Sequence, residues 1–307
     1  MSQKTILSIF TGDDWHAQEA QTGKYTEIEY RAWRDVAKPM GVQLLRASVR
    51  WFKRGRFVKY WRQTSDGWEK STRPVRPTLV YDRTRTFEKK TGRPIFFVKQ
   101  LRQEISRALP LFNVPEFSEV MDNKLYQAMI FRKWMPKTRV WVAGQTVPNP
   151  QGKWIVLKQP EGSAGLQVYI TRKKRFPVDK TLLQQEFVPA THNGQTRDLR
   201  IMFIGNQPQY AFHRVAPKGS LYTNVYLGAK VEMVPLSEIR PILKLSKEIA
   251  RPLAVFPKKI FTLDFLVHHL HKKPFLIETN TMPGTDTFSQ ALLHKILRNL
   301  TRHLIER

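Results

Sequence analysis

The feature that most constrains this fold is a pair of apolar segments near the end of the chain, each interrupted by one carboxylate. IFTLDFLVHH (260–269) carries Asp264, and FLIETN (275–280) carries Glu278 and Asn280. The short connection between them predicts two antiparallel strands, in which side chains two residues apart share a face. Because a buried carboxylate is costly without a compensating partner, the fold must place such partners opposite Asp264 and Glu278.

Two kinds of partner fit these acids. Two carboxylates and an amide oxygen form a hard oxygen cluster suited to Mg²⁺, whose charge would offset the repulsion between the acids. The sequence therefore predicts Asp264, Glu278 and Asn280 as metal ligands. The alternative is that arginine or backbone donors hold each acid separately, and this chain is rich in arginine. The three histidines of the connecting turn are expected at the surface.

The net charge of the chain predicts an anionic partner. The sequence has 52 Lys and Arg against 25 Asp and Glu, a formal charge of +27. Residues 46–107 alone hold 18 basic and 5 acidic residues, a difference of +13, with aromatic residues interleaved. Such a surface attracts nucleic acid, anionic lipid or an acidic protein or peptide, although it also suits a solvated basic face. No nucleic-acid-binding motif accompanies the charge.

Length and composition exclude several classes of protein. A chain of 307 residues is long enough for two or three compact units, and a hydrophobic fraction of 41% is typical of globular proteins. No apolar stretch approaches the roughly 20 residues of a membrane span. The absence of cysteine excludes disulfides, thiolate metal sites and cysteine nucleophiles. With no secretory signal at the N-terminus, we expect a soluble, cytoplasmic protein.

Hydrophobic periodicity predicts a mixed arrangement of strands and helices. Helices are expected at 27–39, 99–109, 122–135, 236–251 and the C-terminal segment ALLHKILRNLTRHL. Strands are expected at 5–12, 76–84, 153–160, 182–190, 260–268 and 274–280, with hairpins around Gly55 and Asn206. This order indicates an α+β or mixed α/β fold, and not a simple doubly wound sheet.

A strand, a glycine loop and a second strand form a candidate phosphate site in LKQPEGSAGLQVYI. Gly162 and Gly165 let backbone amides approach an anion, and Ser163 adds a hydroxyl donor. Taken alone, such a loop is more typical of an ordinary hairpin than of a phosphate site, because it matches neither a Walker loop nor a dinucleotide fingerprint. Lys158 lies in the apolar strand before the loop, where a lysine needs an anionic partner. Lys124, at the start of the 122–135 segment, supplies a second cation.

Two arginines follow in adjoining strands. Arg200 and Arg214 both alternate with apolar residues, so one face of a hairpin is able to carry both guanidinium groups. Two arginines facing a phosphate would stabilise charge that develops in phosphoryl transfer. The alternative is a pair of surface salt bridges, one of them satisfied by Asp198.

The order of these groups resembles that of the ATP-grasp superfamily. The resemblance rests on the run DNK, MPKT, KQPEGSAGLQV, LLQQEFV, RDLR, AFHR, N-x-x-x-G, LDFL and IETNTMPG, which covers about residues 121–285. It implies an ATP-grasp fold preceded by an N-terminal α/β domain. The implied division is a basic, substrate-side domain at 1–120, a lid subdomain at 121–190 and a catalytic subdomain at 191–307. The closest likeness is to the glutathione synthetase, ribosomal-protein glutamyl ligase and D-alanine ligase branch.

The resemblance also implies an activity and a set of roles. The family joins a carboxylate to an amine through an acyl phosphate, using ATP and Mg²⁺, with two ions expected. By matching motif positions, the resemblance implies ATP-binding residues, residues that stabilise the transferred phosphoryl group, and metal ligands. These are Lys124, Lys158, Gly162, Ser163, Gly165, Gln185, Glu186, Phe187 and Val188 for ATP, Arg200, Arg214 and Asn224 for the phosphoryl group, and Asp264, Glu278 and Asn280 for the metal.

Departures from the family pattern leave the substrate open. D-alanine ligases carry an arginine two residues before the metal-binding aspartate, and Thr262 stands at that position here. An acidic peptide or protein is one carboxylate substrate that suits the basic N-terminal region. Two alternatives remain: an ATP-grasp kinase of an anionic metabolite, and a non-catalytic member that binds polyanions.

Overall fold

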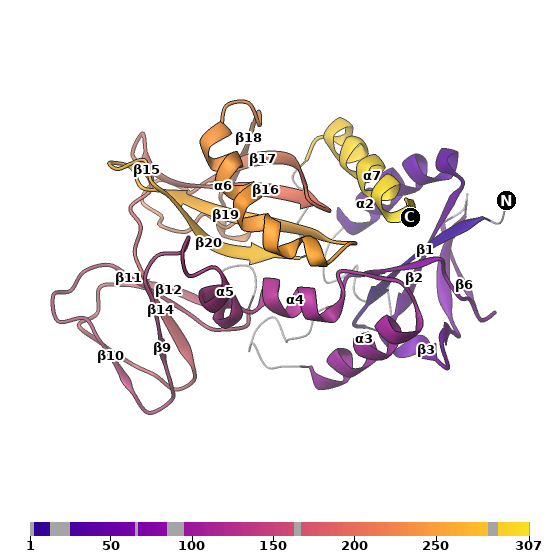
Figure 1. The fold of residues 1–307 in the computed structure, drawn as a ribbon, viewed down its shortest axis with the longest axis horizontal. Coiled ribbons are helices and arrows are strands. Elements are labelled where there is room, and N and C mark those ends of the chain that lie inside the picture. Colours follow the sequence, from indigo (N-terminus) through magenta and orange to yellow (C-terminus); the bar gives the residue numbers. More distant parts are fainter. Residues whose placement is uncertain are drawn as a thin grey trace.

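The described residues form three larger sheets and two short strand pairs, with helices packed against the larger sheets (Figure 1). A computed structural model describes residues 3–12, 25–64, 67–84, 95–162, 167–281 and 288–306, with the side chains of 25–28 left out. The expected mixture of helix and sheet is confirmed. Within the described residues, no helix combines the length and apolar character that crossing a membrane requires.

The N-terminal sheet has the strand order β6-β5-β2-β1-β7-β8. Its strands are β1 (Lys4–Phe10), β2 (Val42–Ser48), β5 (Tyr60–Thr64), β6 (Gly67–Ser71), β7 (Leu79–Asp82) and β8 (Leu111–Phe112). The four strands β2, β1, β7 and β8 are parallel, and β5 and β6 add an antiparallel edge. A separate short hairpin, β3 (Phe52–Lys53) and β4 (Arg56–Phe57), turns at the expected glycine, Gly55.

Helices cover both faces of this sheet, because its strands are apolar on both sides. On one face, Ile6 and Leu44 pack against α2 (Tyr25–Ala37) and the C-terminal helix α7 (Gln290–Ile305). On the other face, Leu7 and Leu45 pack against α3 (Phe96–Ala108). The helix α2 continues into the 3-10 turn η1 (Lys38–Met40) and ends at Gly41, whose φ of 68° suits glycine.

The segment expected as one helix over 122–135 is instead split, and that prediction was wrong in its bounds. α4 (Pro115–Asp122), which the sequence analysis did not anticipate, ends at Asn123, and α5 (Lys124–Ile130) starts directly after it. Asn123 has an extended backbone, and its Oδ1 accepts the Leu125 amide at 2.9 Å, so it caps the second helix. Because the chain changes direction there, Lys124 stands in the first turn of a new helix.

A four-stranded antiparallel sheet, the lid sheet, has the order β12-β11-β14-β9 and projects to one side of the molecule (Figure 1). Its strands are β9 (Thr138–Trp141), β11 (Ile155–Lys158), β12 (Val168–Thr171) and β14 (Leu182–Glu186). A strand pair, β10 (Thr146–Pro148) and β13 (Arg175–Pro177), packs on it around Val147 and Leu157.

The C-terminal sheet is antiparallel, with the order β18-β17-β16-β19-β20. Its strands are β15 (Thr191–His192), which pairs with β16 (Gln195–Ile204), β17 (Gln207–Val215), β18 (Lys230–Val234), β19 (Ile260–Val267) and β20 (Pro274–Asn280). Two further 3-10 turns are η3 (Val225–Leu227) and η4 (Arg251–Val255), and η2 (Val49–Trp51) precedes β3. The two hairpins expected from the sequence, β16–β17 and β19–β20, are confirmed.

The two faces of the C-terminal sheet differ in chemistry. Leu199 and Ile201 of β16 point to one face, where α4 and α6 (Arg240–Ala250) complete an apolar core. Asp198, Arg200 and Met202 alternate with them and therefore point to the opposite face. Met202 packs there with α7 in the same core as the N-terminal sheet. The polar residues at the other end of this face form the candidate site.

Candidate active site

A cavity of about 120 Å³ lies between the lid sheet and the polar face of the C-terminal sheet. The lid sheet contributes Val156 and Lys158, and the C-terminal sheet contributes Asp198, Arg214 and Glu278. The end of β14 and the chain that follows it close one side of the cavity with Gln185, Glu186, Phe187 and Val188, four of the predicted nucleotide-binding residues. Residues predicted from distant parts of the sequence therefore meet around one cavity.

Asp264 and Glu278 are direct cross-strand neighbours. The register pairs Asp264 with Glu278 and Arg200 with Asp264, so three side chains form a row across β20, β19 and β16. A bulge between Asp264 and Phe265 leaves Ile277 as an extra residue, since Phe265 pairs with Leu276. This bulge brings Glu278 into the row, and spacing in the sequence does not reveal it.

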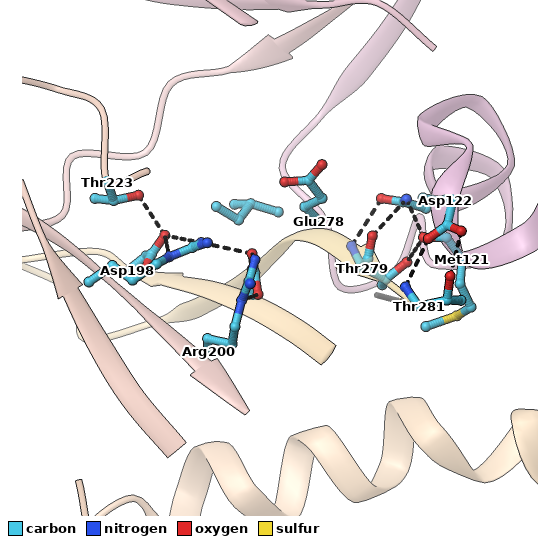
Figure 2. A network of polar contacts seen from close by, with 12 residues as sticks. Met121, Asp122, Asp198, Arg200, Thr223, Glu278, Thr279 and Thr281 are labelled. Carbon is cyan, nitrogen blue, oxygen red and sulfur yellow. Dashed lines mark hydrogen bonds and ion pairs between the residues drawn. The ribbon is translucent and has the colours of Figure 1, made fainter. Parts of the chain in front are cut away.

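A buried ion network surrounds Asp264. Its carboxylate accepts Nε and Nη2 of Arg200 at 2.7 and 2.6 Å, and Nη2 of Arg214 at 2.7 Å. Arg214 also donates to both oxygens of Asp198, at 2.5 to 3.1 Å, and Thr223 Oγ1 donates to Asp198 at 2.5 Å (Figure 2). The expected convergence of the two arginines on one face is confirmed. Asp198 does satisfy Arg214, but in the interior and not at the surface.

The charges of this network support one another. Burial alone would raise the pKa of Asp264, but Arg200 and Arg214 outweigh burial and hold that pKa below its ordinary value. Burial likewise opposes the charge of Arg214, and Asp198 and Asp264 outweigh it, so the pKa of Arg214 is raised. Asp264 and Arg214 are therefore both ionised near neutral pH.

The two predicted lysines approach the row from other elements. Lys124, the first residue of α5, places Nζ 3.1 Å from Glu278 Oε1 and donates to the Gly162 carbonyl at 3.2 Å. Lys158 donates to Gln185 Oε1 at 2.8 Å and to the carbonyl of the bulged Ile277 at 3.0 Å. Burial lowers the pKa of Lys158 to about 8. The side chains of Lys124 and Lys158 are each more than nine-tenths buried, and both lie beside Glu278.

Polar contacts from α4 and α5 hold the end of β20. Asp122 accepts the amide and the hydroxyl of Thr281 at 2.8 and 2.5 Å, and burial raises the pKa of Asp122 to about 6. The Gln127 side chain bonds to both backbone groups of Thr279 at 3.2 Å. Figure 2 shows Glu278 between this network and the one around Asp198. These contacts were not predicted from the sequence, in which the available signal was a polar residue on a helix face that is otherwise buried.

Arg200 and Arg214 hold Asp264, and Lys124 holds Glu278, as the alternative to metal binding expected. Of these two acids, Glu278 lines the cavity and Asp264 is fully buried behind it. The described residues contain no group of three or more His, Asp or Glu side chains placed to hold a metal alone. Mg²⁺ typically takes one or two carboxylates, with the remaining positions filled by phosphates and water. Asp264 Oδ1 accepts a single hydrogen bond from the described residues, and about four lone-pair sites exist on a carboxylate, so both acids retain free acceptor positions. Asn280 pairs with Thr262, two residue pairs further along the two strands.

The remaining predicted residues have different outcomes. Asn224 lines the cavity and also caps η3, since its Oδ1 accepts the Tyr226 amide at 2.8 Å. Gly162 is buried with a φ of 155°, and a Cβ there would lie 2.5 Å from Gln167 Oε1. Ser163 and Gly165 lie outside the described residues.

Comparisons with known proteins agree with this layout. A model of the RimK-like ATP-grasp domain matches residues 143–304. Two proteins of Vibrio vulnificus, strains YJ016 and CMCP6, each called a probable alpha-L-glutamate ligase, are 26% identical over 157 residues, which is 47% of this chain. That stretch is 48% of each relative, so the chain spans about half the length of the curated relatives it matches.

Solved structures share the fold over almost the whole chain. A D-cycloserine synthetase superposes with a TM-score of 0.62 at 13% identity, covering 97% of this chain and 99% of that one. The structure of an ATP-grasp ligase in complex with a phosphomimetic variant of a minimal precursor, Mg and ADP gives a TM-score of 0.58 at 12% identity, covering 97% of this chain and 99% of that one. At such identities the likeness shows the fold alone, and it confirms the expected ATP-grasp architecture.

Proposed function

The chain belongs to the RimK-like ATP-grasp family, and we propose that it is an ATP-dependent carboxylate–amine ligase. In this reaction the γ-phosphoryl group of ATP passes to a substrate carboxylate. An amine then attacks the acyl phosphate, which gives an amide, ADP and phosphate. The observation that carries the proposal is the row of Glu278, Asp264 and Arg200 on the C-terminal sheet. Lys158 of the lid sheet lines the same cavity as Glu278.

The nucleotide is proposed to lie between the two sheets. Gln185 to Val188 line the cavity and supply main-chain groups for the adenine edge, while the apolar Val156 and Ile170 cover the base. Lys124 and Lys158 are the cations for the phosphates, and Gly162 allows close backbone approach. A cavity of about 120 Å³ holds only a few waters, so ATP enters by displacement of the lid sheet from the C-terminal sheet.

The phosphoryl group is proposed to transfer beside the row of ionised residues. Asp264, Glu278 and Asn280 would hold Mg²⁺, which when bound neutralises charge on the β- and γ-phosphates. Arg200 and Arg214 are fixed in place by Asp264 and Asp198, so they present positive charge without reorganising during the reaction. Asn224 lies at the same cavity wall and orients the transferred group. The binding of two ions is part of this proposal.

The substrate-side domain is proposed to be 1–120, followed by the lid at 121–190 and the catalytic part at 191–307. The carboxyl ends of the parallel strands β1 and β7 are where open α/β sheets bind ligands. The charge of +13 over residues 46–107 suits an acidic peptide or protein as the carboxylate substrate. The name of the Vibrio relatives makes glutamate the first amino acid to test as a substrate.

The test is ATP turnover with candidate substrates. The protein is incubated with Mg-ATP, pooled amino acids and acidic peptides, and free phosphate and new product masses are measured. We expect phosphate release together with a product whose mass equals the sum of two substrates minus water. Phosphate retained on the product would indicate a kinase instead.

A matched pair of variants ties turnover to the site. Glu278→Gln is expected to lower turnover at least about a hundredfold, because it weakens a proposed ligand of the Mg²⁺ ion that would neutralise charge on the phosphates. Glu248→Gln is the control, since Glu248 pairs with Lys133 at 3.2 Å on the surface. Turnover that is unchanged in Glu278→Gln, or absent with every substrate pool, would contradict the proposal.

A further inference from the structure

A second concave site lies at one end of the lid sheet. It is a groove of about 760 Å³, lined where β9 and β11 begin and where β12 and β14 end. The lining includes Lys137 and Arg139 from the start of β9, Lys153 and Trp154 before β11, and Arg172 after β12. Neither the nucleotide cavity nor the ion network around Asp264 uses any of these five residues.

The groove is strongly basic. Lys137, Arg139, Lys153 and Arg172 are all exposed, and in the described part of the chain none of them forms an ion pair. The basic run continues past the groove through residues 173–175, and Glu186 is the single acid in the lining. Four unneutralised cations around one concave surface raise the local concentration of polyanions.

An aromatic platform lies among these cations. Trp154 is 42% exposed, its ring centroid is 6.2 Å from that of Phe187, and Arg172 Cζ lies 5.7 Å from the Trp154 ring. The Arg172 Nε donates to the Gly152 carbonyl at 2.9 Å, which fixes the guanidinium beside the indole. An exposed indole flanked by cations matches the way single-stranded nucleic acids are bound, by base stacking on a ring while basic groups follow the backbone.

We propose that this groove binds single-stranded RNA. An acidic peptide fits it less well, because it has no planar base to stack on the exposed Trp154 ring. Among the strands that line the groove, β11 and β14 are paired on two sides, whereas β9 is an edge strand. Nearby main-chain groups are also used, since Lys137 O accepts the Glu186 amide and Lys153 O accepts Asn149 Nδ2.

The single acid of the groove favours RNA over DNA. A carboxylate repels phosphate but accepts a hydrogen bond from a ribose 2′-hydroxyl, the group that distinguishes RNA. Glu186 is exposed at the end of β14, next to Phe187. The groove shares Gln185, Glu186 and Phe187 with the wall of the nucleotide cavity, but its four cations and Trp154 line the groove and not that cavity. RNA binding is therefore tested with variants that leave the nucleotide cavity unchanged.

The test is fluorescence anisotropy of the full chain with a labelled single-stranded RNA of about 12 nucleotides. The triple variant Lys137→Gln, Arg139→Gln, Lys153→Gln is expected to weaken binding at least tenfold and to reduce the slope of log K against log salt by roughly 2. Trp154→Ala is expected to weaken RNA binding about fivefold to a hundredfold. Trp154→Phe, which keeps an aromatic ring, is expected to retain most of the wild-type affinity.

A second triple variant, which removes the same number of positive charges elsewhere on the surface, is the matched control. Arg240→Gln, Lys244→Gln, Lys247→Gln removes three exposed cations from α6, which covers the opposite face of the C-terminal sheet. RNA binding that survives this change but not the groove triple supports the proposal. Equal losses in the two triples, tighter binding of DNA of the same sequence, or groove-dependent binding of poly-glutamate without RNA binding would each overturn it.

Discussion

Lys124 Nζ lies 3.1 Å from Glu278 Oε1, and this pair joins the first turn of α5 to the end of β20. Lys124 is 6% exposed and Glu278 is 27% exposed at the side chain, so the pair borders the cavity. Burial opposes the charge of Glu278, but Lys124 and Lys158 outweigh it, together lowering the pKa of this acid despite repulsion from Asp264. The site therefore keeps an ionised carboxylate and two cations in one small volume.

Replacing Lys124 by methionine should weaken ATP binding about tenfold to a hundredfold, because a charge-assisted contact to phosphate is lost. Isothermal titration calorimetry with ATP measures this effect. Lys133→Met is the matched control, since Lys133 forms an ion pair of nearly equal length, 3.2 Å, with the exposed Glu248. Equal affinities in the two variants would show that Lys124 does not contact the nucleotide.

The network around Asp264 should be important for stability. Replacing Asp198 by alanine leaves Arg214 buried with one partner fewer, and we expect the free energy of unfolding to fall by about 3–5 kcal/mol. Urea denaturation followed by circular dichroism gives this value. Asp35→Ala is the control, because Asp35 pairs with Arg34 at the surface and should cost at most about 1 kcal/mol. If Asp198→Ala lowered the free energy of unfolding by no more than this control, the network would contribute little to the stability of the fold.

Lys158 should make nucleotide binding depend on pH. Its pKa is lowered from 10.5 to about 8 by burial, so the free protein loses this charge as the pH rises through about 8. We expect ATP affinity to fall above that pH and ATP binding to take up protons, which calorimetry in buffers of different ionisation enthalpy detects. Lys158→Arg should keep its charge and flatten the profile. An unchanged profile in that variant would rule out Lys158 as the source.

The same shift has a defined effect on stability. Between about pH 8 and 10.5 the unfolded chain holds a proton on Lys158 that the folded chain has released, so this group makes stability rise with pH in that window. Below about pH 8 both states are protonated and the full cost of burying the charge is present. Chemical denaturation at pH 7 and pH 10 measures the free energy of unfolding of the wild type and of Lys158→Gln. The increase between the two pH values that is due to Lys158 should appear in the wild type and be absent from the variant.

Local patterns were sufficient to predict much of the architecture and the residue types of the site. Strand alternation placed Arg200 and Arg214 on one face, and the two apolar segments with one acid each gave the β19–β20 pair. The bulge at Ile277 was not predictable, because the register of β20 depends on packing against α4 and α5. The assignment of each residue to ATP, metal or substrate stays a prediction.

The error over residues 122–135 has a similar cause. The apolar periodicity continues through the segment, but Asn123 caps α5 while Asp122 binds Thr281 from the C-terminal sheet. A contact between residues 159 positions apart in the sequence therefore decides where the helix begins. Periodicity within a short window contains no information about such a contact.

Gly162 should be sensitive to a single methyl group. A Cβ there would lie 2.5 Å from Gln167 Oε1 and 3.0 Å from Gln167 Cβ. In addition, the backbone φ of 155° is strained for any residue type other than glycine. We expect Gly162→Ala to raise the KM for ATP about tenfold, because the displaced Gln167 disturbs the carbonyl that Lys124 contacts. Steady-state turnover at varied ATP concentration measures this change.

A double variant separates crowding from backbone strain. If the clash with Gln167 is the cause, adding Gln167→Ala to Gly162→Ala should restore most of the KM, because the smaller side chain makes room for the methyl group. Gly194→Ala is the control, since Gly194 has a positive φ of 75° but no atom within 4 Å of a Cβ. It should cost stability without changing the KM. Failure of the double variant to recover would assign the effect to the backbone conformation of Gly162 itself.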